Sequence, residues 1–117
     1  MSNAQGFSSG DLLVFQIESG FGLLKVLGID ETGSDLVWHI RVYRDLFPEI
    51  EFAEMAIASQ GSMAVEIGHI ALTDRAFEST QVARLANRPL SEDEMALAYA
   101  WNGEVSDRSI RLTLGLR

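Results

Sequence analysis

Three short apolar runs, separated by breaks rich in glycine and acidic residues, dominate the first third of the chain. The runs cover residues 11–17, 21–29 and 36–43, and the breaks fall at 18–20 and 30–35. Runs of this length between turn-forming residues are typical of β-strands joined in a meander. A meander this tight, in a chain of 117 residues, predicts a small β-barrel or a strongly curved antiparallel sheet.

Alternation within the runs indicates which face of each strand is buried, because successive side chains of a strand point to opposite faces. The first run is apolar on both faces, which predicts a strand covered on both sides. Gly22 and Gly28 predict a bulge or tight coiling in the second run. In the third run we expect a core face of Leu36, Trp38, Ile40 and Val42. We expect the opposite face to be a mixed surface of Val37, His39, Arg41 and Tyr43.

The second half of the chain is patterned less regularly. Residues 63–72 predict a fourth strand with a kink at Gly68, and the alternation over 110–116 predicts a closing strand. Pro48 excludes a central strand from the connection at 45–60, where residues 52–59 fit a short helix or an ordered loop. Residues 81–86 are ambiguous between strand and loop, and 59–62 predict a turn.

The clearest helix signal covers residues 92–101. Ser91 and Glu94 have the spacing of a capping box, in which each side chain accepts a hydrogen bond from the other residue's backbone N–H. The acidic residues at 92–94 also complement the positive end of the helix dipole. A shorter helix is expected over 75–79, capped by Thr73 or Asp74.

Together these elements predict a mainly β domain of the α+β class. It is expected to be a small curved antiparallel sheet or SH3-like barrel of about five strands, with one helix at about 92–101. Residues 7–117 are expected to form this single β-rich domain. Residues 1–6 are expected to be a tag remnant or a disordered N-terminus, because Ser2-Asn3-Ala4 has the sequence that tag cleavage leaves behind.

Composition and charge narrow the classes of partner and compartment. The chain is 47% apolar, carries a net charge of −8 and contains no cysteine. It therefore has no disulfides or cysteine nucleophiles. The negative charge disfavours nucleic acid and anionic membranes as partners. No run approaches the ~20 apolar residues of a membrane span, and the first ten residues show no signal peptide, so we expect a cytoplasmic protein.

The sequence contains little recognisable catalytic chemistry. A metal site needs about three or four protein ligands at suitable spacing, which the chain does not show, and we expect no metal and no cofactor. His39 also shares its predicted strand face with Arg41, which repels cations. His69, at the expected bend, fits a structural role held by backbone hydrogen bonds. With Glu66 it is also the candidate acid–base pair, provided that the kink brings both side chains to one face.

Two groups of residues are candidates for binding a partner. The first group lies in one connection with no basic residue among its members: Asp45, Glu49, Glu51 and Glu54. These carboxylates would attract a basic protein. The simpler alternative is that the connection is a solvated loop. Tyr43 and Trp101 are aromatic, expected to be partly exposed, and of types favoured at interfaces. The alternative for Trp101 is that it packs the 92–101 helix onto the sheet.

Three segments resemble a family of small bacterial proteins. Residues 10–17 and 22–27 resemble the opening hairpin of barrel-forming immunity proteins of polymorphic-toxin systems, and more distantly that of SH3-like toxin–antitoxin endoribonucleases. Residues 67–73 resemble a segment of relatives of that immunity class. The resemblance implies a barrel and an inhibitor of a secreted toxin, and it carries over no catalytic residue. Because those endoribonucleases are basic at their RNA surface, the acidic charge of this chain argues against that branch.

The function expected from the sequence is therefore a non-enzymatic protein-binding module with a protein partner of basic character. The resemblance adds a toxin-neutralising immunity protein as its more specific form. One alternative is a small hydrolase or nuclease using His69. The other is a subunit that self-associates into a homo-oligomer.

Overall fold

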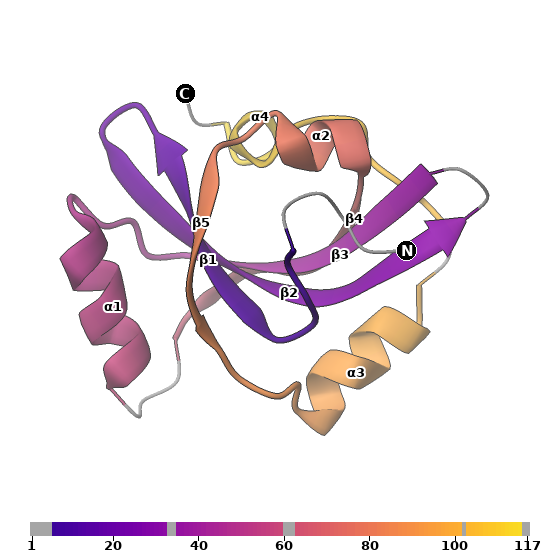
Figure 1. Ribbon diagram of the computed structural model, residues 1–117, viewed down its shortest axis with the longest axis horizontal. Coiled ribbons are helices and arrows are strands. Elements are labelled where there is room, and N and C mark those ends of the chain that lie inside the picture. The colour runs from indigo at the N-terminus through magenta and orange to yellow at the C-terminus, as the bar shows by residue number, and fades with distance from the viewer. Residues whose placement is uncertain (1–5, 33–34, 60–62, 102, 116–117) are drawn as a thin grey trace.

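The computed structural model describes residues 6–32, 35–59, 63–101 and 103–115, and its centre is one antiparallel sheet. The strands lie in the order β4-β3-β2-β1-β5 and are strongly twisted (Figure 1). The sheet is open, with β4 and β5 at its edges, which confirms the predicted curved antiparallel sheet. The strands are β1 (Asp11–Ile17), β2 (Gly20–Thr32), β3 (Asp35–Tyr43), β4 (Val65–Thr73) and β5 (Val82–Asn87).

Short helices cover both faces of the sheet, and they include those expected near 75–79 and 92–101. Within the described residues the helices are α1 (Ile50–Ala58), α2 (Asp74–Glu78), α3 (Glu92–Tyr99) and α4 (Ile110–Thr113). α3 is the predicted helix, and both hydrogen bonds of its capping box are present. Thr73 caps α2 as expected, with its side chain accepting from the backbone N–H of Ala76. No helix in the described part of the chain is long and apolar enough to cross a membrane.

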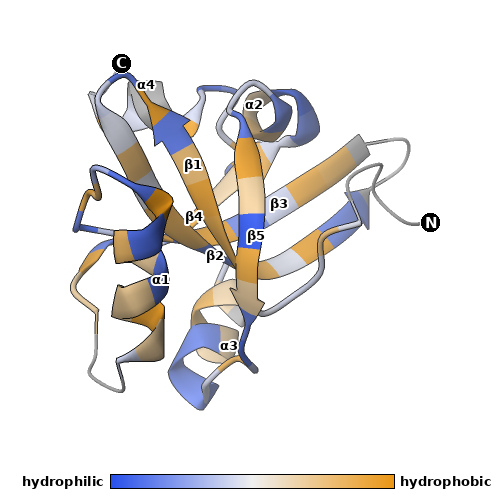
Figure 2. Ribbon diagram, turned by 60° about the vertical axis from the view of Figure 1, so that its left-hand side comes forward, coloured by the Kyte–Doolittle hydropathy of each residue, from blue (hydrophilic) through white to orange (hydrophobic). Residues whose placement is uncertain are grey.

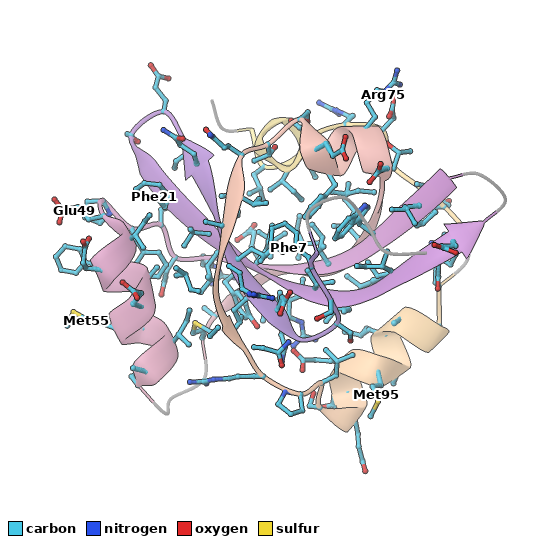
Figure 3. The ribbon with its side chains drawn as sticks, viewed as in Figure 1. Phe7, Phe21, Glu49, Met55, Arg75 and Met95 are labelled. Carbon is cyan, nitrogen blue, oxygen red and sulfur yellow. The ribbon has the colours of Figure 1, made fainter. Side chains whose placement is uncertain are left out.

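One face of the sheet, here called the α2 face, carries the larger core. It contains the predicted inward residues of β3 together with Leu13 and Phe15 of β1, all buried. Trp38 stacks on Phe77 of α2 with ring centroids 3.9 Å apart. Phe7 packs edge-on against both rings and lies over the middle of the sheet (Figure 3). In Figure 2 much of each strand has the hydrophobic colour, as expected of strands that carry core residues.

The opposite face, here called the α3 face, is also covered, so the mixed surface predicted there is wrong. Val37, His39 and Tyr43 are all less than 9% exposed. α1 packs Ala53 and Ile57 against the β1–β2 half of this face, and α3 contacts β2 and β4. Alternation along β3 could not reveal this burial, because the pattern of a strand does not show which other elements pack on its faces.

Two of the irregularities in the strands fall where glycine predicted them, and a third, between β1 and β5 at Leu12 and Leu13, has no glycine. The β2–β3 register shifts between Val26 and Gly28, and the β3–β4 register shifts opposite the segment that contains Gly68. Gly22 allows a close approach, since a Cβ there would overlap the ring of Phe15. The register shifts of β2 and β4 and the close approach to Phe15 therefore occur at or beside glycines.

The predicted closing strand at 110–116 is wrong. Residues 110–113 form α4, and residue 116 lies outside the described residues. Ile110 and Leu114, one helical turn apart, both pack on the α2-face core, which a helix permits. The edge of β1 is instead occupied by β5, from the segment that was ambiguous between strand and loop.

Candidate functional site

The predicted acidic connection forms an exposed surface together with apolar side chains. All four acidic residues are exposed, as are three large apolar neighbours. Figure 3 shows Glu49 and Met55 on the outer side of α1, away from the sheet. This α1 surface is defined as Asp45, Leu46, Glu49, Glu51, Phe52, Glu54 and Met55.

Helix geometry explains how the α1 surface divides from the core. Ala53 and Ile57 are four residues apart and point to the sheet. The opposite arc of the helix then carries Phe52 and Met55, which are 48% and 65% exposed. The connection thus forms a helix whose outer face mixes carboxylates with large apolar groups.

The carboxylates of the α1 surface make no ion pair within the described residues. At the other end of the helix the guanidinium of Arg88 donates to the backbone carbonyl of Ile57, and Arg44, next to Asp45, pairs with Glu66 of β4. The Arg88 contact complements the negative end of the α1 dipole. Negative charge therefore remains concentrated around the first turns of α1.

The two aromatic candidates lie elsewhere. Tyr43 is 8% exposed and packs with Ala53 and Ile57 in the α3-face core, so its expected exposure is wrong. Burial raises the pKa of its hydroxyl, and the carboxylate of Glu94 adds to that shift. Trp101 is half-buried and meets the ring of His39 edge-to-face, with centroids 4.7 Å apart. It packs the end of the α3 segment on the sheet, as the alternative expected.

A buried ion pair joins α3 to the sheet. Lys25 Nζ lies 3.0 Å from a carboxylate oxygen of Glu94, and both side chains are 7% exposed. Burial would raise the pKa of Glu94, but the hydrogen bonds from the Ser91 backbone and from Lys25 outweigh it and lower the pKa overall. The sequence showed Glu94 only as a capping residue, and nothing in the local pattern indicates its second role.

A chain of three polar side chains crosses the α3 face. Asp30 Oδ2 lies 2.7 Å from His39 Nε2, and His39 Nδ1 lies 2.8 Å from His69 Nε2. The two imidazole rings are stacked nearly parallel, at 11°. His39 is 2% exposed, whereas Asp30 is 57% exposed. Burial, and then the proximity of His39, lower the pKa of His69.

Strand register brings these three side chains together. His39 pairs with Gly28 on one side and with Ala71 on the other. Gly28 has no side chain, so the neighbour of His39 on β2 is Asp30, two residues along and on the same face. His69 is the corresponding diagonal neighbour on β4. Sequence reasoning missed Asp30 because its position in a turn-like break gave no functional signal.

The predicted pair of Glu66 and His69 is not assembled in this way. Glu66 accepts a hydrogen bond from Arg44 at 3.2 Å, on the exposed part of β4. His69 is engaged by His39 instead. The irregularity at Gly68 thus places His69 beside a histidine, and its acid–base role stays a prediction.

A cavity of about 440 Å³ adjoins the histidine pair. It lies between β4 and the segment that follows α3, and its lining includes His69, Trp101 and Glu104. Around this cavity and elsewhere in the described chain, no three His, Cys, Asp or Glu side chains are grouped so as to hold a metal ion.

The chain matches no family model, and no curated protein or solved structure shows significant similarity to it. Two places in the described part of the chain are candidates for binding, the α1 surface and the cavity lined by His69.

Proposed function

We propose that this protein is a non-enzymatic binding module that recognises a basic protein segment through the α1 surface. The observation that carries the proposal is the exposure of Met55 and Phe52 on a helix face shared with Glu51 and Glu54. Dipole complementarity accounts for an acidic residue in the first helical turn, but not for two large apolar side chains in water. Mixed apolar and charged surfaces of this kind favour protein partners.

The apolar and acidic side chains of the α1 surface favour a partner that is both apolar and basic. Apolar contact supplies area to bury, and unpaired carboxylates attract lysine and arginine and accelerate encounter. A second copy of this chain would oppose like charges, so self-association through the same surface is disfavoured. A toxin-neutralising immunity protein is the more specific form of this proposal, in which the basic partner is a toxin domain.

The proposal is tested with a defined probe, a labelled amphipathic peptide of leucine and lysine, followed by fluorescence anisotropy. We expect binding that weakens from about 30 to about 300 mM NaCl, as the Debye length shortens. Reversal of three charges (Glu49→Lys, Glu51→Lys and Glu54→Lys) should weaken binding by roughly tenfold or more and flatten its salt dependence. Phe52→Ser with Met55→Ser should weaken binding but keep the salt dependence.

The matched control reverses three exposed carboxylates away from α1: Glu18→Lys, Glu78→Lys and Glu92→Lys. This variant has the same net charge as the α1 variant. Equal weakening in both would show that overall charge, rather than the α1 surface, governs binding, and would overturn the proposal. A leucine–glutamate peptide should not bind.

A further inference from the structure

The hydrogen-bond chain on the α3 face determines which nitrogen of His69 is left for a ligand. When both rings are neutral, the Nε2–H of His39 donates to the carboxylate of Asp30, and Nδ1 of His39 is left as an acceptor. The only nitrogen facing that acceptor is Nε2 of His69, which must therefore donate. This assignment follows from the hydrogen-bond network. It leaves Nδ1 of His69 with a lone pair.

The position of this lone pair favours a ligand that donates a hydrogen bond. Within the described residues, Nδ1 of His69 has no hydrogen-bond partner, and His69 lines the cavity beside α3. The lowered pKa of His69 keeps its ring neutral near pH 7, so it acts as an acceptor there. Asp30 and His39 hold the ring in this tautomer and are positioning residues.

The remaining lining gives the cavity its charge preference. Trp101 supplies an aromatic surface, and its indole N–H is already donated to the backbone carbonyl of Glu104 at 2.7 Å, which fixes the side chain. Ile70 and Val105 supply apolar walls. Among the described lining residues Glu104 is acidic and none is basic. Aromatic and acidic surroundings favour a cation over an anion.

Nearby basic side chains do not reverse this preference. Arg41 donates its Nε–H to the carbonyl of Gly68 at 3.2 Å and pairs with the carboxylate of Glu94, and neither Arg41 nor Arg108 lines the cavity. Lys25 shares that carboxylate, so these three side chains together carry one positive charge, which lies outside the cavity lining. The exposed carboxylate of Asp30 adds negative charge behind the histidine pair.

We propose that this cavity binds a small organic ammonium ion, which donates an N–H to Nδ1 of His69 and rests its positive charge against Trp101. A volume of about 440 Å³ admits a small molecule. The site is separate from the α1 surface and does not depend on the function proposed for it.

The test compares n-butylammonium with two matched probes at physiological salt, with NMR signals of the Trp101 indole and the His69 ring as readouts. Tetramethylammonium has the same charge but no N–H to donate, and butyrate has the opposite charge. We expect n-butylammonium to shift both signals in a saturable way. Tetramethylammonium should bind about tenfold more weakly, the effect of one lost hydrogen bond, and butyrate should not bind.

Two variants locate the site. His69→Ala should weaken n-butylammonium binding about tenfold and bring it to the level of tetramethylammonium, whereas His69→Gln keeps an acceptor and should lose less. The comparison of the two cations on the unaltered protein remains decisive if a variant does not fold. Equal affinities for the two cations, or shifts at Met55 of α1 without shifts at Trp101, would overturn the proposal.

Discussion

Replacing Glu94 with alanine perturbs the polar contact that fixes α3 to the sheet. Residue Glu94 is 5% exposed, and its carboxylate accepts hydrogen bonds from Lys25 at 3.0 Å, Arg41 at 3.4 Å and the Ser91 backbone at 2.8 Å. In its absence Lys25, a residue that is 6% exposed, keeps one partner among the described residues, the carbonyl of Pro89 at 3.3 Å. Because an uncompensated buried charge is costly, Glu94→Ala should lower the free energy of unfolding by about 3–5 kcal/mol.

Three further variants distinguish the contribution of the ion pair to stability from that of the helix cap. Ser91→Ala removes the acceptor for the Glu94 backbone N–H but leaves the ion pair, and should cost about 1 kcal/mol. Glu94→Gln can keep the capping box but not the charge, so its loss should lie between the other two. Adding Lys25→Met to Glu94→Gln removes the buried charge as well. This double variant should recover most of the loss, because replacing a buried ion pair with uncharged groups is often close to neutral.

Urea unfolding followed by tryptophan fluorescence and by circular dichroism measures these differences. In a domain of this size about 1 kcal/mol corresponds to roughly 4 °C in Tm, so Glu94→Ala should lower Tm by roughly 10–20 °C. A loss no larger than that of Ser91→Ala would show that the ion pair adds nothing to the cap. A double variant as unstable as Glu94→Ala would show that the unpaired charge of Lys25 is not the cause.

Two other predictions concern packing and pH. Gly22→Ala should lower the free energy of unfolding by about 1–3 kcal/mol, because its Cβ would overpack against the enclosed ring of Phe15. Gly28→Ala should lower it much less, since a Cβ there meets nothing within 4 Å. Equal losses in urea unfolding would contradict this. Since the pKa of His69 is lowered on folding, the unfolded chain binds more protons below about pH 6.5. The free energy of unfolding should therefore fall as pH drops from about 6.5 through the lowered pKa. His69→Gln should make this pH dependence shallower in urea unfolding measured across that range. An unchanged pH dependence would exclude His69 as its source.

The sequence by itself determined the elements whose signals are local. Turn residues and alternation defined β1, β2 and β3, because a strand and its tight turns are encoded by neighbouring residues. The capping box set the start of α3 for the same reason, since its hydrogen bonds join residues three apart. The acidic side chains around α1 were also recognisable as exposed, although the helix itself was not distinguished from a loop.

Only the tertiary structure decided how distant segments use the sheet. The alternating pattern at 110–113 lies in a helix that packs Ile110 on the α2-face core, and β5 pairs with the edge of β1 instead. The pattern of β3 could not show that α1 and α3 would bury its second face. The pairing of His39 with His69 likewise depends on a register between strands separated by a helix and set by an irregularity near Gly68. Cross-strand neighbours are fixed by that register, and no local pattern encodes it.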